Sequence, residues 1–473
     1  MSEDEAVESV PWYWRSLDFE QLARDYPPPP DYFKTTYVMP REQLRALQEK
    51  RFLATMARGW EIPFFQRHWR RAGMEPGDIR GLDDLPRIPP YSVHDIRDSI
   101  ERDPPFGDFI GLKPEDGKRM PLVLQTSGGT TGLPRPMLYS PQDRETMAIL
   151  GGRRFLMHGI RPGDLVLVTY ALGLSNGGMA PREALWRYTG ATPVMTGSGS
   201  STPTRRQIEL IKAWKINVIL GFPAYLRHMA LVARDELGID PKHLGIRLIG
   251  THLGMEDRAR LEDMWGAPCF DMYGTHESGM MGAECRHQTG MHVQEDAFIL
   301  EIADPDTGEI LADGQKGTVY ITTLYKYGAP QIRFNVNDIS AYATDTCPCG
   351  STMRRLQRIF GRNDNMVKLR GVNVFPEAVG AVVAEDARTN GEYFCFVDQV
   401  GEAGTDEMTV MVEMRDATAD RAQVKADLVR RMKEVLGVRV EVELTGSGEL
   451  DRHTGTSQTS KVKRLMDRRK RSG

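Results

Sequence analysis

The chain has 473 residues, of which 40% are apolar and 27% are charged, and its formal net charge is −4. This near-neutral balance gives no reason to expect nucleic acid or an acidic membrane as a partner, and no apolar run is long enough to span a bilayer. Five cysteines in so long a chain cannot form a disulfide framework, and the acidic N-terminus does not resemble a targeting signal. We therefore predict a cytoplasmic protein with more than one domain.

Helices and strands alternate along the first half of the chain. A helical periodicity covers residues 41–71, and short strand-like runs follow at 120–124 and 137–139. From residue 122 to residue 253 the order of elements is typical of a parallel α/β sheet. The strand-like runs there are 165–170, 217–221 and 246–250, and the helical stretches between them are 205–214 and 224–236.

The C-terminal part has a different pattern. Strand-like alternation at 298–323 predicts a β-rich subdomain. The last hundred residues combine two strand-like runs, a charged helix and a final strand, at 393–397, 408–414, 417–436 and 438–444. Because the stretch 361–365 is polar, we place a domain boundary there. The predicted fold is a large α/β N-terminal domain, residues 1–362, with a small α+β C-terminal domain, residues 363–473.

A loop rich in glycine and hydroxyl groups lies between the runs at 120–124 and 137–139. Its core, residues 126–132, holds three glycines and four hydroxyl-bearing residues. Glycine lets backbone N–H groups approach a ligand closely and hydroxyl groups add donors, so the loop suits a polyphosphate. It lacks the Gly-Lys-Ser/Thr ending of a Walker A loop, and a glycine-rich surface turn is the alternative.

Three further motifs follow along the chain. They are Asp271-Met-Tyr-Gly-Thr-His-Glu277, Gln331-Ile-Arg-Phe-Asn-Val-Asn-Asp338 and Gly361-Arg-Asn-Asp-Asn-Met-Val-Lys-Leu-Arg-Gly-Val-Asn-Val-Phe-Pro376. Together with the loop, their order and spacing resemble the adenylate-forming (acyl-CoA synthetase) superfamily, and most closely its phenylacetate-CoA ligase branch. The resemblance extends from about residue 40 to about residue 463, nearly the whole chain.

The resemblance implies a ligase that converts a carboxylic acid and ATP to an acyl-adenylate and transfers the acyl group to coenzyme A. An aryl or arylalkyl acid is expected. Glu277 matches the family's magnesium ligand, Asp338 the carboxylate that binds the ribose hydroxyls, and Arg362 the arginine near the ribose and phosphate. The implied nucleotide site also contains Thr126, Ser127, Gly128, Gly129, Thr130, Thr131, Gly132, Asp271, Tyr273, Gly274 and His276. As alternatives, Asp338 is an ordinary loop acid and Tyr273 a core residue.

The resemblance also implies a mobile C-terminal lid. Lys461 matches the family's catalytic lysine, although Ser460 replaces the usual glycine and Lys463 is a rival, and Asp364 matches the hinge. The implied substrate pocket contains Tyr170, Leu174, Phe222 and Gly250. Since the family's Tyr-Gly-Leu-Phe pattern becomes Tyr-Ala-Leu-Gly-Leu here, we expect a wider or differently shaped acid than phenylacetate.

A metal site is predicted in addition. Cys347 and Cys349 form a knuckle-like turn, and Cys285 and His292 complete a Cys₃His set of the kind that binds zinc. Some members of the phenylacetate branch carry a similar set, which implies a structural zinc ion. His287 competes with His292 for the fourth position, and three buried free thiols are the alternative.

Two other functions remain open. One keeps the adenylation but uses an acceptor other than coenzyme A, such as an amine or the hydroxyl group of a deazaflavin cofactor. The other is a nucleotide-binding protein without turnover, which two departures from the family suggest: His276, where the family usually has threonine, and Ser460. The expected partners are a small carboxylic acid, ATP and coenzyme A, with a homodimer as one candidate assembly and with neither nucleic acid nor membrane.

Overall fold

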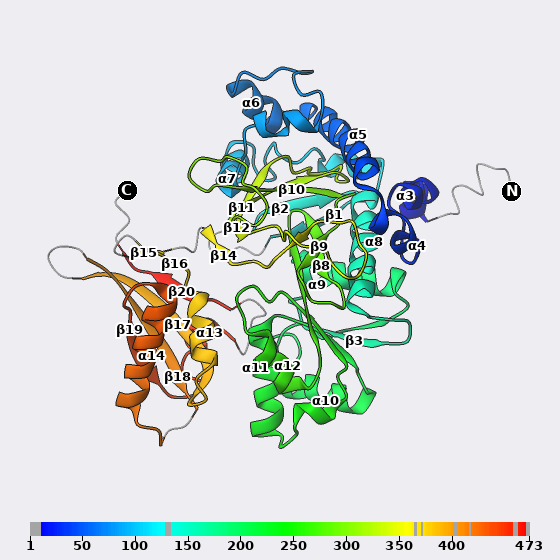
Figure 1. Ribbon diagram of the computed structural model, residues 1–473. Coiled ribbons are helices and arrows are strands. Elements are labelled where there is room, and N and C mark those ends of the chain that lie inside the picture. Colours follow the sequence, from blue (N-terminus) through cyan, green and yellow to red (C-terminus); the bar gives the residue numbers. More distant parts are fainter. Residues whose placement is uncertain are drawn as a thin grey trace. The chain divides into compact units, whose positions relative to one another are not determined.

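The computed structural model describes residues 11–127, 134–363, 367–369, 372–400, 405–415, 418–456 and 462–469. The chain divides into two compact units, each built from segments far apart in the sequence (Figure 1). The first unit comprises residues 1–195, 270–336 and 340–357, and the second comprises residues 196–269, 337–339 and 358–473. The predicted domain boundary at residues 362 and 363 falls within the second unit and stays a prediction.

The first unit begins with helices. Residue 18 caps a short helix that the sequence did not indicate, because its carboxylate accepts the N–H of Gln21 at 2.9 Å. The helical pattern at 41–71 forms two helices rather than one, because the residue before Pro63 is extended and proline disfavours a helical residue before it. The helices up to residue 118 are α2 (Trp12–Arg15), α3 (Phe19–Asp25), α4 (Asp31–Lys34), η1 (Thr36–Val38), α5 (Arg41–Trp60), α6 (Pro63–Arg71), η2 (Leu82–Arg87), α7 (Val93–Arg102) and η3 (Pro114–Lys118).

Strands and two helices complete the first unit. The strands β1 (Val123–Thr126) and β2 (Pro136–Tyr139) pair antiparallel and flank the glycine-rich loop. The predicted strand at 165–170 is β3 (Leu165–Val168), which runs parallel to β4 (Thr192–Met195). The helix α8 (Pro141–His158) is buried along almost its whole length and packs against α9 (Asn176–Tyr188) and β8 (Gly279–Glu284). The remaining strands are β7 (Cys269–Thr275), β8 (Gly279–Glu284), β9 (Met291–Val293), β10 (Phe298–Ala303), β11 (Gly317–Thr323) and β13 (Arg355–Leu356).

The antiparallel part of the first unit is the predicted β-rich region. The strand β7 pairs with β8, β8 with β9, and β9 with β13, all antiparallel. The strands β10 and β11 form a second antiparallel pair within the stretch 298–323, as the alternation there predicted. The strand β12 (Phe334–Ser340) continues from the first unit into the second.

The second unit contains the other parallel pair of the α/β region. The strands β5 (Val218–Leu220) and β6 (Leu248–Thr251) correspond to the predicted runs at 217–221 and 246–250 and pair in parallel. The helix α10 (Thr204–Trp214) agrees with the predicted helix at 205–214. The other helical elements of residues 196–269 are α11 (Pro223–Leu231), the π-helix η4 (Val232–Glu236), η5 (Pro241–Leu244) and α12 (Arg258–Trp265).

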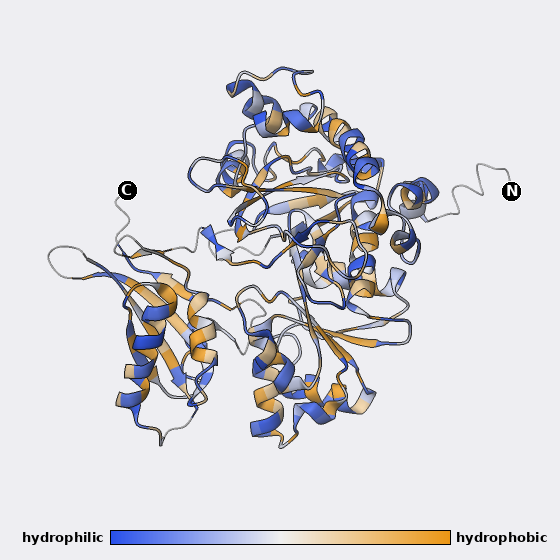
Figure 2. Ribbon diagram, in the orientation of Figure 1, coloured by the Kyte–Doolittle hydropathy of each residue, from blue (hydrophilic) through white to orange (hydrophobic). Residues whose placement is uncertain are grey.

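The C-terminal residues form a four-stranded sheet in the order β19-β18-β17-β20, with α13 and α14 packed against it. The helix α14 buries Val424, Leu428, Met432 and Leu436, which are four residues apart and therefore share one face. Figure 2 shows apolar residues along these strands and along one side of α14. The elements are β14 (Gly361–Arg362), β15 (Val367–Leu369), β16 (Val372–Val374), α13 (Ala378–Ala384), β17 (Thr389–Val400), β18 (Thr405–Met414), α14 (Arg421–Leu436), β19 (Glu441–Thr445), α15 (Asp451–Thr454) and β20 (Leu465–Asp467).

Two predicted boundaries in this region were wrong. The helix predicted at 417–436 begins at Arg421, because Asp420 accepts the N–H of Ala422 at 2.9 Å and so caps the helix. The strand predicted at 438–444 begins at Glu441. The two predicted strands 393–397 and 408–414 form the antiparallel pair β17–β18.

A buried ion-pair network lies within the second unit. Glu392 on β17 accepts hydrogen bonds from Arg464 at 2.8 Å and from Arg227 of α11 at 3.3 Å, and Arg227 also pairs with Glu256. Burial raises the pKa of Glu392, but the two guanidinium groups outweigh this effect and lower the pKa to about 2. The network therefore holds an ionised carboxylate between two arginines.

We expect Glu392→Gln to lower the free energy of unfolding by about 3–5 kcal/mol at pH 7, because it leaves the buried guanidinium group of Arg464 without its counter-ion and Arg227 with Glu256 alone. The folded-state pKa lies below the ordinary value of 4.5. The stabilisation by the ionised carboxylate is therefore present above that value and disappears as the pH falls towards 2. Chemical denaturation at pH 7 and at pH 3 measures both effects.

Glu434→Gln is the control, because Glu434 forms an exposed ion pair with Arg430 at 3.2 Å. This variant should differ from the wild type by less than about 0.5 kcal/mol. Equal losses in the two variants would contradict the prediction, and so would a loss in Glu392→Gln that does not shrink at low pH.

Candidate active site

The predicted magnesium ligand Glu277 lies in the tight turn between β7 and β8. The N–H of Ser278 donates to the hydroxyl oxygen of Thr275 at 3.0 Å and closes this turn. The register of the two strands shifts between Tyr273 and Gly274, and a Cβ atom on Gly274 would lie 2.6 Å from the carbonyl oxygen of Gly279. Only glycine permits so close an approach of the two backbones, which explains this glycine of the motif.

The carboxylate of Glu277 is almost completely buried and is paired with an arginine. Arg135 Nη2 lies 2.5 Å from Glu277 Oε1, and Arg135 Nε donates to the hydroxyl oxygen of Ser127 at 3.1 Å. Burial acts to raise the pKa of Glu277, but the charges of Arg135, His276 and Lys326 outweigh it, so the pKa is lowered. The turn therefore presents an ionised carboxylate, a hard oxygen ligand that suits Mg²⁺.

The start of the glycine-rich loop lies beside this turn. Ser127 connects to Glu277 through Arg135, and the N–H of Thr126 donates to the carbonyl oxygen of Leu174 at 2.8 Å. The structure thus brings the first two loop residues together with one predicted substrate-pocket residue. The other predicted loop residues, Gly128, Gly129, Thr130, Thr131 and Gly132, lie outside the described residues.

The remaining predicted residues of the first unit differ in exposure. Asp271 and Tyr273 are buried in β7, with 3% and 4% exposure. His276 is half-buried in the turn. Tyr170 is buried, whereas the side chain of Leu174 is 60% exposed. Their predicted contacts with nucleotide or acid stay predictions.

The second unit pairs two of the predicted nucleotide residues. Asp338 and Arg362 stand directly opposite each other in the antiparallel pair β12–β14, and Arg362 Nη1 lies 2.9 Å from Asp338 Oδ1. Asp338 is therefore part of a strand and not an ordinary loop acid. Asp364 and Lys461 lie outside the described residues.

Two predicted substrate residues also lie in the second unit. Phe222 is the N-cap residue of α11, and its ring centroid lies 5.5 Å from that of His252. Gly250 is buried at the end of β6, and its carbonyl oxygen accepts the N–H of Gly221 at 3.2 Å. The hydrogen bond joins the ends of the parallel strands β5 and β6, where ligands of α/β sheets often bind.

The four predicted zinc ligands converge in the first unit. One ligand atom from each of Cys285, His292, Cys347 and Cys349 lies within 4.8 Å of all the others. The sulfur atoms of Cys285 and Cys347 are 3.5 Å apart, and Cys349 Sγ lies 3.4 Å from His292 Nε2. Tetrahedral zinc with metal–sulfur bonds of about 2.3 Å separates two sulfur ligands by about 3.8 Å, so the set fits that ion. His287 is not part of the group.

The electrostatics of this group also fit a metal site. Burial raises the pKa of Cys285 to about 12 and lowers that of His292 to about 4. The histidine is therefore held neutral, which is the form that binds metals, while the buried thiol needs a nearby cation to become a thiolate. Cys269 and Cys395, which have no place in this group, are buried core residues as predicted.

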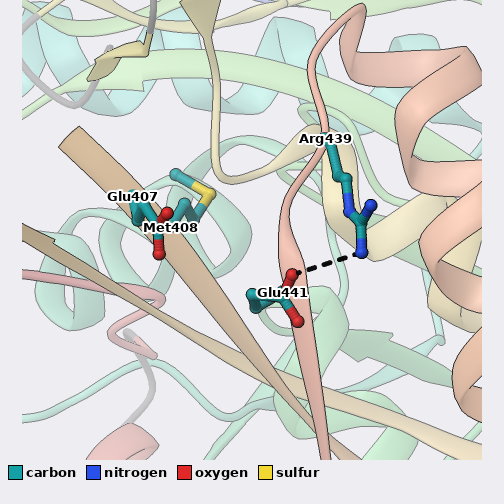
Figure 3. Close-up of a pocket in the computed structure, with 4 residues that line it drawn as sticks. All are labelled: Glu407, Met408, Arg439 and Glu441. Atoms are coloured by element: carbon teal, nitrogen blue, oxygen red, sulfur yellow. Dashed lines mark ion pairs between the residues drawn. The ribbon is translucent and has the colours of Figure 1, made fainter. Parts of the chain in front are cut away.

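A polar pocket in the C-terminal sheet region is unrelated to the predicted sites. It is lined by Glu407, Met408, Arg439 and Glu441, and Figure 3 shows the ion pair between the last two, which measures 3.7 Å. None of the residues that the sequence motifs singled out lines this pocket. We assign it no function.

The sequence analysis did not predict the contacts of three basic residues near the loop and the turn. Arg135 pairs with Glu277, Lys326 donates to the carbonyl oxygen of Glu277, and Arg144 donates to the side chains of Gln125 and Asn176 at 2.7 and 2.6 Å. A basic residue inside a buried run, such as Lys326 after β11, is the one signal that could have indicated a buried counter-ion.

Comparison with known proteins agrees with the motifs. Residues 86–324 match the AMP-binding enzyme family, and residues 371–469 match the AMP-binding enzyme C-terminal domain. The chain is 32% identical to a phenylacetate-coenzyme A ligase of Thermus thermophilus, over 91% of this chain and 98% of the relative. It is 31% identical to the phenylacetate-coenzyme A ligase of Escherichia coli, over 88% of this chain and 93% of the relative.

Solved structures give the same result. A 2-hydroxyisobutyryl-CoA ligase in the postadenylation state, in complex with an acyl-AMP, is 28% identical with a TM-score of 0.82, covering 93% of this chain and 94% of the other. The same ligase with acyl-AMP and CoA in the thioesterification state is 29% identical with a TM-score of 0.67, covering 94% of both chains.

Proposed function

Because this chain belongs to the AMP-binding enzymes of the phenylacetate-CoA ligase type, we propose that it joins a carboxylic acid to coenzyme A at the expense of ATP. In the first step a carboxylate oxygen attacks the α-phosphorus of ATP and pyrophosphate leaves. In the second step the thiolate of coenzyme A attacks the acyl carbon and AMP leaves. The observation that supports this best is the ionised, buried Glu277 next to Ser127 at the start of the glycine-rich loop.

Each proposed role follows from the chemistry of the residue. Asp338, paired with Arg362 across two strands, offers a carboxylate to ribose hydroxyl groups, and Arg362 offers a fixed positive charge to a phosphate. Glu277 would hold a magnesium ion, which neutralises charge on the phosphates when it is bound. Positioning and charge neutralisation are the main contributions that a protein makes to such a transfer.

We propose an aryl or arylalkyl acid as the substrate. The proposal is supported by the relatives named for phenylacetate and by the aromatic Phe222 and Tyr170 among the pocket candidates. The departure at residues 170–174 favours an acid of a different shape from phenylacetate. A cytoplasmic location and a homodimer stay predictions, and no helix in the described part of the chain is both long and apolar enough to cross a bilayer.

A pyrophosphate-release assay across a panel of aromatic, arylalkyl and short hydroxy acids, with and without coenzyme A, tests the proposed function. We expect release that depends on the acid, and a thioester product only when coenzyme A is present. Release without thioester formation would indicate another acceptor, such as an amine or a cofactor hydroxyl group. Nucleotide binding without release for any acid would indicate a protein without turnover.

We also propose that the Cys₃His group binds a structural zinc ion. Metal analysis should find about one zinc per chain, because the four ligand atoms are already gathered within tetrahedral reach. Cys347→Ser should lose the zinc and lower the melting temperature, since metal binding in such a site contributes folding free energy.

Cys395→Ser is the matched control, because Cys395 is equally buried but lies outside the group. This variant should keep about one zinc per chain, and its melting temperature should fall on zinc removal as that of the wild type does, whereas the melting temperature of Cys347→Ser should not respond to a chelator. Metal-free wild-type protein with the same melting temperature as the zinc-loaded form would refute the structural role.

The catalytic lysine is testable although Lys461 lies outside the described residues. If its ammonium group neutralises charge on the α-phosphate, Lys461→Ala should reduce pyrophosphate release by about 10²–10³-fold. The same variant should still convert a chemically prepared acyl-adenylate to thioester at nearly the wild-type rate, because the lysine serves only the first step. Lys461→Arg should remain impaired, since the planar guanidinium group does not replace a compact charge.

Lys463→Ala is the control for this assignment. Lys463 is exposed, and its backbone N–H donates to the carbonyl oxygen of Thr454 at 3.3 Å. The Lys463→Ala variant should therefore release pyrophosphate normally. If it abolishes the first step and Lys461→Ala does not, the assigned lysine is wrong by two positions.

A further inference from the structure

Three buried side chains hold the turn that carries Glu277, and the proposed reaction assigns none of them a role. The turn consists of residues 276–278. Tyr139 Oη donates to the carbonyl oxygen of residue 276 at 2.9 Å. Lys326 Nζ donates to the carbonyl oxygen of residue 277, and Tyr325 Oη donates to that of residue 278 at 2.7 Å. Each of the three consecutive carbonyl groups of the turn thus accepts a hydrogen bond from a side chain of another element.

The three donors are themselves fixed. Tyr139, Tyr325 and Lys326 are 1%, 4% and 4% exposed, so they have little freedom to move away. The ammonium group of Lys326 lies 4.8 Å from the ring centroid of Tyr139, a cation–π contact. Just after Lys326, the carboxylate of Asp143 accepts the N–H groups of residues 327 and 328, at 2.6 and 3.1 Å.

The turn is also packed closely against one donor. Gly279, which follows the turn, has a φ of +88°, and a Cβ atom there would lie 2.7 Å from Tyr325 Oη. The hydroxyl group therefore occupies space that a side chain would otherwise fill. Because the donors fix the peptide planes on both sides of Glu277, they also fix the direction in which its side chain leaves the backbone.

We propose that Tyr139, Tyr325 and Lys326 are positioning residues that hold Glu277 in place to bind a divalent cation together with a nucleotide. This inference rests on the proposed function, in which Glu277 is the metal ligand. It adds hydrogen bonds from three side chains to the turn of Glu277, which the sequence motifs did not indicate. Groups that orient a metal ligand in this way typically change metal affinity by about 10–100-fold when they are removed.

The test measures Mn²⁺ binding in the presence of a non-hydrolysable ATP analogue, with the free Mn²⁺ followed by electron paramagnetic resonance. This readout needs neither the acid nor turnover. Tyr139→Phe, Tyr325→Phe and Lys326→Met each remove one donor and keep most of the apolar volume. We expect each variant to weaken the apparent Mn²⁺ affinity by about tenfold or more.

Tyr342→Phe is the matched control. Tyr342 is buried in the same unit, and its hydroxyl group donates to the backbone carbonyl oxygen of Leu300 at 3.0 Å, away from the turn. The Tyr342→Phe variant therefore loses a hydrogen bond from a tyrosine hydroxyl group to a backbone carbonyl oxygen, as Tyr325→Phe does. We expect a similar fall in melting temperature for the two variants but less than a twofold change in Mn²⁺ affinity for Tyr342→Phe.

The outcomes separate this inference from the proposed function. If folded Tyr325→Phe and Tyr139→Phe bind Mn²⁺ as tightly as the wild type, or if Tyr342→Phe weakens binding equally, the positioning role is refuted while acid-dependent pyrophosphate release by the wild type still stands. If Lys326→Met does not fold, the two tyrosine variants decide. Wild-type protein that binds no Mn²⁺ with the nucleotide and releases no pyrophosphate with any acid would refute the proposed function, and this inference with it.

Discussion

The carboxylate of Asp143 joins two segments of the chain that are nearly two hundred residues apart in sequence. It accepts the N–H and the hydroxyl group of Ser140, each at 2.9 Å, and so completes a capping box with Ser140, the N-cap residue of α8. It also accepts the N–H groups of Tyr327 and Gly328. Because the residue is fully buried, these donors replace the water that an unfolded chain would offer it. Asp143 thereby fixes the backbone just after Lys326, whose ammonium group donates to the carbonyl oxygen of Glu277.

Burying a charged group costs free energy, and in this structure arginine pairs with several buried carboxylates, of which three bear on the regions discussed above. Glu277 is paired with Arg135, Asp338 with Arg362, and Glu392 with both Arg464 and Arg227. The guanidinium group of arginine stays protonated at physiological pH and forms several directional hydrogen bonds at once. It therefore suits a buried carboxylate better than an ammonium group does. Two of these three pairs contain a residue that the motifs assign to the nucleotide site.

The pairing of Glu277 has a consequence for metal binding. Its Oε1 atom is already in contact with Arg135, so a divalent cation that binds this carboxylate competes with a guanidinium group. The competition is favourable only if the cation arrives with further ligands, such as phosphate oxygens, because a buried guanidinium group also needs a partner. A metal ion and a nucleotide together meet this condition, since the phosphates can accept the hydrogen bonds that Arg135 gives up.

Much of the local structure was predictable because it depends on neighbouring residues. The runs at 165–170, 217–221 and 246–250 are strands, and the helix predicted at 205–214 is α10, because apolar spacing alone determines which face each element buries. Boundaries were less accurate where a single residue decides them, as at Pro63 and Asp420. A cap or a proline acts on one turn of a helix, whereas a hydrophobic periodicity extends over several turns, so the periodicity alone does not show where the helix begins or ends.

The sequence by itself determined the family, the α/β character and the identity of the residues in the motifs, including the four Cys and His residues of the predicted metal group. Only the tertiary structure decided which residues come into contact. It places His292 rather than His287 beside the cysteines. It also pairs Arg135 with the carboxylate of Glu277 and lets Lys326 donate to the carbonyl oxygen of Glu277. The physical reason is that a hydrogen bond or an ion pair depends on distances of a few ångströms. Residues such as 135, 277 and 326 come within that range only after the strands between them have paired.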